Sequence, residues 1–136
     1  MRAPLPPWTH RFVADAGKLT QEFFAFLRDV DGVLKASAPN VQTASYTLVE
    51  QDAGGKVEMN VGSANNLTVP PSSTVAFDVG TRIQITQAGA GQTTLVAGAG
   101  VTIRARVGLK IIGQWGVAYL DKRGTDEWVA SGDLSA

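Results

Sequence analysis

The stretch that decides the fold is Val79–Ile103, VGTRIQITQAGAGQTTLVAGAGVTI. Ile83 and Ile85 alternate with polar neighbours, which is the period of a strand with one buried face. Two clusters of small residues, 87–92 and 97–100, separate this strand from two further short ones. The pattern predicts three strands joined by tight turns, a β-meander.

Alternating patterns and turn signals continue on both sides of this stretch. The turn signals recur about every eight to twelve residues, a spacing typical of a β-sandwich or barrel. Further strands are expected at 46–50, 56–61, 67–69, within 110–120, and at 127–130. We therefore expect a mainly β fold: a small antiparallel sandwich or barrel over residues 39–136, preceded by an extended arm and one short amphipathic helix.

Residues 1–17 are rich in proline, which favours an extended polyproline II segment. Such an arm cannot bury enough surface to fold alone. Its large apolar side chains are suited to a groove on a partner, and the alternative is a disordered terminus. The residues expected to anchor the arm are Leu5, Pro6, Pro7, Trp8 and Phe12.

Residues 18–38 are expected to form a short amphipathic helix and a linker. Thr20 is a suitable N-cap, and Glu22 places a carboxylate in the first turn. The following apolar residues recur at helical spacing and form one broad face. This face either packs on the chain's own domain or forms an oligomer interface. The residues of that interface are Phe23, Phe26, Leu27, Val30 and Leu34.

The composition narrows the classes of function. The chain has 136 residues, which suits one domain plus an appendage, and its 12 basic and 12 acidic residues give a net charge of zero. No clustered basic footprint is visible, so nucleic-acid binding is not expected. The sequence has no cysteine, which excludes disulfides and thiolate sites. No apolar run approaches the length of a membrane span, so no membrane association is expected.

We find no catalytic or metal-binding constellation in the sequence. The single histidine, His10, lies in the arm without a carboxylate cluster around it. The segment Gly89–Gly91 resembles a phosphate-binding loop, but a strand pattern follows it where a helix would be needed. We interpret it as a hairpin turn. The protein is therefore expected to be no enzyme and to hold no cofactor or metal.

Three aromatic residues in the last part of the chain could stack on sugars. Packing in the core or between subunits is the commoner role of such residues in a small β-domain, and we favour it. The candidates for glycan stacking are Trp115, Tyr119 and Trp128.

Residues 46–103 resemble a β-module of fibre and structural proteins of tailed bacteriophages. The shared cadence is Asp-x-Gly, Asn-x-x-Thr-Val-Pro, Phe-x-x-Gly-Thr, Gln-x-Gly-x-Gly-Gln-Thr and Gly-x-Gly-Val-Thr-Ile. The continuation from Gly124 to Leu134 is similar to the end of that module. The N-terminal PLPPWTHRFVADAGKLTQEFFAFL is similar to leaders that anchor phage proteins near the head–tail junction.

The resemblance implies a virion structural protein that is made in the host bacterial cytoplasm. A short fibre or spike, attached to the head, neck or tail through the arm and helix, is the leading interpretation. Its expected partners are capsid, portal, neck or tail proteins and further copies of itself as a homotrimer. Symmetric assembly would add burial to a domain with a thin core. The alternatives are a capsid decoration protein, a tail-tube or baseplate component and, in a different class, a carbohydrate-binding module.

Overall fold

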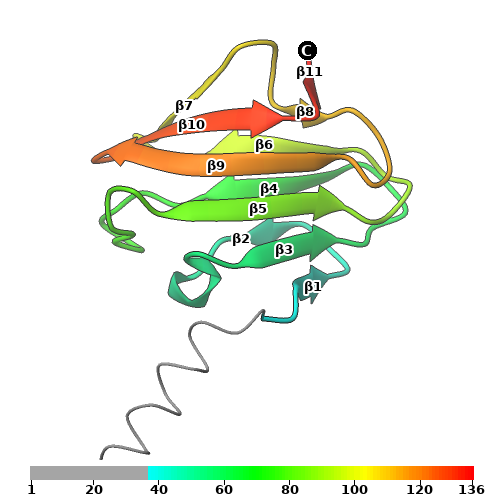
Figure 1. Ribbon diagram of the computed structural model, residues 1–136, viewed down its shortest axis with the longest axis horizontal. Helices are drawn as coiled ribbons and strands as arrows, with labels where there is room; N and C mark the ends of the chain where they lie inside the picture. The colour runs from blue at the N-terminus through cyan, green and yellow to red at the C-terminus, as the bar shows by residue number, and fades with distance from the viewer. Residues whose placement is uncertain (1–36) are drawn as a thin grey trace, which may run out of the picture. The chain divides into compact units, whose positions relative to one another are not determined.

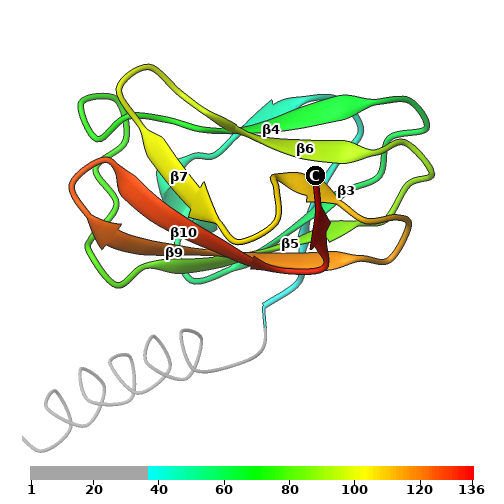
Figure 2. The same ribbon diagram turned by 90° about the horizontal axis from the view of Figure 1, so that it is seen from above.

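Successive strands alternate between two sheets, except at one antiparallel pair near the C-terminus, in the computed structural model, which describes residues 37–136 (Figures 1 and 2). Sheet A holds β1 (Asn40–Gln42), β3 (Lys56–Met59), β5 (Arg82–Gln87), β7 (Thr102–Ala105), β9 (Val117–Gly124) and β10 (Glu127–Gly132). Sheet B holds β2 (Tyr46–Thr47), β4 (Asn65–Val69), β6 (Thr93–Ala97), β8 (Lys110–Ile111) and β11 (Leu134–Ser135). A single 3-10 turn, η1 (Glu50–Asp52), is the helical element of this part of the chain.

The first six strands form three stacked rungs, where a rung is one strand of sheet A followed by one strand of sheet B. The rungs are β1–β2, β3–β4 and β5–β6, and neighbouring rungs pair in parallel within each sheet. Lys56 lies opposite Gln84 in sheet A, and Asn65 lies opposite Thr93 in sheet B. The offset between the second and third rungs is 28 residues in both sheets. The second and third rungs therefore repeat one another in structure, whereas the first rung is offset from the second by 17 residues in sheet A and 21 residues in sheet B.

The chain reverses direction after the third rung. β8 and β9 pair antiparallel with β6 and β5, respectively. β10 and β11 add the next layer on β9 and β8, and β7 closes sheet A beside β10 in parallel. The strand order is β1-β3-β5-β9-β10-β7 in sheet A and β11-β8-β6-β4-β2 in sheet B. Parallel and antiparallel pairs thus occur in both sheets.

The core lies between the two sheets and follows from the alternation within each strand. Ile83 and Ile85 point inward from β5, and Leu67 and Leu95 do so from β4 and β6. The Phe77 ring meets the indole of Trp128 edge to face, with centroids 5.5 Å apart. The fully buried apolar side chains of this core include Leu48, Val57, Met59, Leu67, Val69, Ile83, Ile85, Ile111 and Leu120.

The predicted mainly β fold with two packed sheets is confirmed, but the predicted pairing is wrong. β5, β6 and β7 do not form a meander, because β6 lies in sheet B while β5 and β7 lie in sheet A. The sheets are mixed, whereas antiparallel pairing was expected. The cluster 87–92 is a corner that carries the chain from one sheet to the other, so it is not a hairpin turn.

This corner needs glycine because it touches the corner of the rung before it. A Cβ at Gly91 would lie 2.0 Å from the carbonyl oxygen of Ser63, and one at Gly89 would lie 2.3 Å from that of Val61. The N–H of Gly91 donates to the Val61 carbonyl oxygen at 2.9 Å. The hydrogen-bonded stacking of rungs therefore continues through the corner, where only glycine fits.

Buried polar side chains hold the inside of the same corner. Thr93 Oγ1 donates to Asn65 Oδ1 at 2.8 Å, and the Thr93 backbone N–H donates to Gln87 Oε1 at 3.0 Å. All three side chains are almost completely buried. Within residues 37–136, no buried side-chain nitrogen or oxygen lacks a hydrogen-bond partner. The corner is therefore fixed by polar contacts as well as by close packing.

The predicted arm and helix lie outside the residues that the structure describes. This applies to the anchoring residues from Leu5 to Phe12 and to the interface residues from Phe23 to Leu34. Their roles stay predictions.

Candidate functional site

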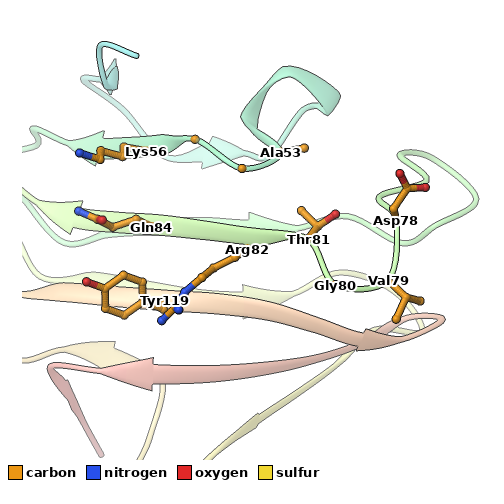
Figure 3. Close-up of a pocket in the computed structure, with 11 residues that line it drawn as sticks. Ala53, Lys56, Asp78, Val79, Gly80, Thr81, Arg82, Gln84 and Tyr119 are labelled. Atoms are coloured by element: carbon orange, nitrogen blue, oxygen red, sulfur yellow. The ribbon is translucent and has the colours of Figure 1, made fainter. Parts of the chain in front are cut away.

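A shallow groove with a volume of about 670 Å³ lies on the outer face of sheet A (Figure 3). Its floor is built from strands β3, β5 and β9, and its end walls come from two loops. The strand residues that line it are Lys56, Arg82, Gln84 and Tyr119, and the loop residues are those of 53–55 and 78–81.

The alternation that builds the core also places the groove residues. Ile83 and Ile85 point inward from β5, so Arg82 and Gln84 point to the outer face. The strand register then sets Lys56 opposite Gln84, and Gln84 opposite Tyr119. These three side chains form a row across three strands, as Figure 3 shows.

Arg82 is held in place by the ring of Tyr119. The guanidinium carbon lies 4.3 Å from the ring centroid, which is the geometry of a cation–π contact. Arg82 Nε also lies 3.5 Å from Asp121 Oδ1, although both side chains are about half exposed and such a pair contributes little stability. The stack therefore orients the guanidinium while leaving it accessible at the surface.

The loop 78–81 forms a firm wall of the groove. The Gly80 N–H donates to the Lys122 carbonyl oxygen at 2.8 Å, and Gly80 has φ 96°, a conformation that favours glycine. Beneath the loop, the buried Lys122 Nζ donates to the Phe77 carbonyl oxygen at 2.6 Å. These contacts fasten the loop to β9, so the groove is preformed.

The structure places the three predicted aromatic residues in different environments. Tyr119 is half-buried and lines the groove. Trp128 is 1% exposed inside the core, so a role in stacking on sugars is wrong and the packing interpretation applies to it. Trp115 is 66% exposed on the loop between β8 and β9, outside the groove.

A polar network lies in the first rung, whose strands β1 and β2 are end strands of the two sheets. The Tyr46 hydroxyl donates to Asp52 Oδ2 at 2.8 Å, and the Asn40 side-chain amide donates to Asp52 Oδ1 at 2.9 Å. Asp52 is 4% exposed. Burial raises the pKa of Tyr46, and the hydrogen bond to Asp52 raises that pKa further. This network satisfies the polar groups at the open end of the rung stack.

Sequence reasoning found one groove residue, Tyr119, and missed its partners. The outward positions of Arg82 and Gln84 could have been read from the alternation in β5. Their position next to Lys56 could not, because it depends on parallel pairing at the 28-residue offset. The groove is a product of the strand order.

Comparisons with protein-family models, with curated proteins and with solved structures found no match. Within residues 37–136, no group of three or more histidine, cysteine, aspartate or glutamate side chains could hold a metal ion. The same residues contain no helix of the length and apolarity that a membrane span requires.

Proposed function

We propose that the protein is a non-enzymatic structural component of a bacteriophage particle, a short trimeric fibre or spike. In this proposal residues 1–38 attach it to the head, neck or tail, and the β-domain projects. The observation that carries the proposal is the stack of rungs with a corner in which only glycine fits. Such a stack is a stiff unit, because hydrogen bonds join its rungs both within the sheets and through the corner.

The resemblance to phage modules supports the same proposal at the residues that carry it. The segment Gln-x-Gly-x-Gly-Gln-Thr corresponds to the corner from Gln87 to Thr93, with its two tightly packed glycines. The segment Asn-x-x-Thr-Val-Pro begins at Asn65 and runs through β4. The residues that carry the resemblance therefore include positions that the rung architecture requires.

The trimeric part of the proposal is supported by the exposed apolar side chains. Within residues 37–136, six large apolar side chains are exposed on a small domain. Assembly around a threefold axis would remove some of this surface from water. These residues are Val41, Val49, Val79, Val107, Ile112 and Trp115.

Attachment is tested by deleting residues 1–17 and measuring incorporation into particles by quantitative mass spectrometry. We expect particles that lack the protein, while circular dichroism of the purified variant still shows the β-domain. The matched control is Pro4→Ala, which keeps the large apolar side chains of the arm and should be incorporated normally. Unchanged incorporation of the deletion variant would place attachment in the β-domain and favour capsid decoration.

A further inference from the structure

We infer that the groove on sheet A binds an oligosaccharide that carries a carboxylate. This inference concerns an activity of the β-domain itself and does not depend on a role in a phage particle. It rests on the charge, the hydrogen-bonding groups and the accessibility of the side chains that line the groove.

Two cationic side chains of the groove can bind an anionic group. They are Lys56 and Arg82, and the carboxylates beside them are those of Asp78 in the lining and of Asp121, 3.5 Å from Arg82. Lys56 forms no ion pair with any residue of 37–136. Arg82 contacts Asp121 through Nε at 3.5 Å, and its side chain is more than half exposed. A carboxylate can accept two parallel hydrogen bonds from a guanidinium group.

The other lining groups fit sugar hydroxyls. The Gln84 amide can donate and accept hydrogen bonds, and so can the Tyr119 hydroxyl. One face of the Tyr119 ring lies against the Arg82 guanidinium, whose carbon is 4.3 Å from the ring centroid. A volume of about 670 Å³ lies within the range of small-molecule sites. A short chain of sugar rings carrying one acid group matches this combination.

Two other classes of ligand fit the groove less well. A peptide that adds a strand needs a free sheet edge, and β3, β5 and β9 are each paired on both sides. Nucleic acid needs a continuous basic footprint, and Asp78 and Asp121 interrupt the positive charge here. Recognition in the groove must therefore come from side chains acting on a small acidic ligand.

The inference is tested by titrating the full-length protein, labelled with ¹⁵N, with trigalacturonate and with sialyllactose. The neutral counterparts are the methyl ester of trigalacturonate and lactose. We expect saturable chemical-shift changes confined to residues 53–56, 78–84 and 119 with at least one acidic sugar. We expect its neutral counterpart to bind about tenfold more weakly, because charge-assisted hydrogen bonds are lost.

A pair of arginine variants separates a specific site from general surface charge. Arg82→Gln is expected to weaken binding of the acidic sugar by about tenfold. Arg104→Gln is the matched control, because Arg104 is also an exposed arginine beside a carboxylate on sheet A but lies outside the groove. It is expected to leave binding unchanged, and both variants should keep the wild-type spectrum elsewhere.

Four results would overturn the inference. They are the absence of groove shifts with both acidic sugars at millimolar concentration, equal binding of acidic and neutral sugars, and equal weakening by the two arginine variants. The fourth is the appearance of the same shifts with sodium acetate at equal carboxylate concentration, which would show a simple anion site.

Discussion

The backbone conformation of Trp115 and the exposure of its side chain are both unfavourable in free energy. Its φ of 66° lies in the left-handed region, which bulky residues rarely adopt, and its indole is 66% exposed. The Trp115 N–H donates to the Gln87 carbonyl oxygen at 2.6 Å, which ties the β8–β9 loop to the glycine corner. The loop thus holds a large apolar side chain outward at an energetic cost.

This strain predicts the order of stability of two Trp115 variants. Trp115→Gly should be more stable than Trp115→Ala by about 1 kcal/mol, because glycine adopts positive φ without a Cβ penalty. Urea unfolding followed by circular dichroism measures the difference. Equal stability of the two variants would show that the backbone here is not strained.

Asp126 joins three parts of the β-domain. Its Oδ1 accepts a hydrogen bond from the Ser72 N–H at 2.6 Å, and its carbonyl oxygen accepts one from the Thr102 N–H at 2.9 Å. The first contact holds the pKa of the Asp126 carboxyl below its ordinary 3.8. Ionised Asp126 therefore stabilises the fold above pH 3.8, and this contribution is lost as pH falls through the lowered pKa.

We expect Asp126→Ala to lower the melting temperature at pH 7, whereas Asp126→Asn keeps an acceptor for Ser72 and should lower it less. Below pH 3.8 the difference between wild type and Asp126→Ala should shrink as the carboxylate is protonated. Melting curves between pH 2 and 7 test both points. A difference that stays constant across this range would contradict the role of the charge.

Tyr46 gives the opposite dependence, at alkaline pH. Its pKa lies above the ordinary 10.0, because of burial and the hydrogen bond to Asp52. The protonated hydroxyl thus contributes stability that is complete below pH 10.0 and is lost as pH rises through the raised pKa. We expect Tyr46→Phe to be less stable at pH 8 and to have a flatter loss of stability above pH 10.0, measured by urea unfolding. A parallel loss in both proteins would assign the alkaline transition to another group.

At the scale of the element, the alternation in the sequence predicted most of the strands but missed the short β1 and β11, and it did not predict which strands pair. Ile83 and Ile85 mark the buried face of β5, and this face is the observed one. Local turn chemistry does not distinguish a hairpin from a corner, because both need small residues. The outcome at 87–92 depends on contact with Val61 and Ser63, which belong to the preceding rung. No local pattern records that contact.

The corner predicts different costs for two glycine-to-alanine substitutions. Gly91→Ala should destabilise the domain by about 3 kcal/mol, because its Cβ would collide with the Ser63 backbone. Gly62→Ala is the matched control, because its Cβ would meet no atom within 4 Å. Chemical denaturation of both variants gives the two free energies. A Gly91→Ala variant as stable as Gly62→Ala would mean that the rungs do not touch at this corner.

At the scale of the whole molecule, the sequence predicted a mainly β domain and missed its repeat. The 28-residue offset joins pairs such as Lys56 with Gln84 and Asn65 with Thr93, which share polarity but not identity. Two strands that pair in parallel lie far apart in the sequence and are not joined by one tight turn. No turn signal therefore marks them as partners. The alternation within strands and the spacing of turn signals therefore predicted the fold class, whereas the strand order and the groove that depends on it required the structure.

The trimer is a prediction at this scale. Size-exclusion chromatography with multi-angle light scattering of the full chain should give a mass near three times 14.3 kDa at micromolar concentration. Ile112→Ser combined with Trp115→Ser removes two exposed apolar side chains from the loop between β8 and β9. A stable wild-type monomer would contradict the trimer. A loss of mass in the double variant would place the loop that carries Ile112 and Trp115 in the contact.

The glycine corner also defines how the stack of rungs could be lengthened, one rung at a time. Neighbouring strands lie about 4.8 Å apart, so each rung inserted between β5 and the reversing strands would extend the stack by that distance. Every inserted rung would need glycine at the positions that Gly89 and Gly91 occupy, because each new corner would rest on the one before it. In a longer domain of this architecture, the number of such glycine pairs in the sequence should therefore indicate the number of added rungs.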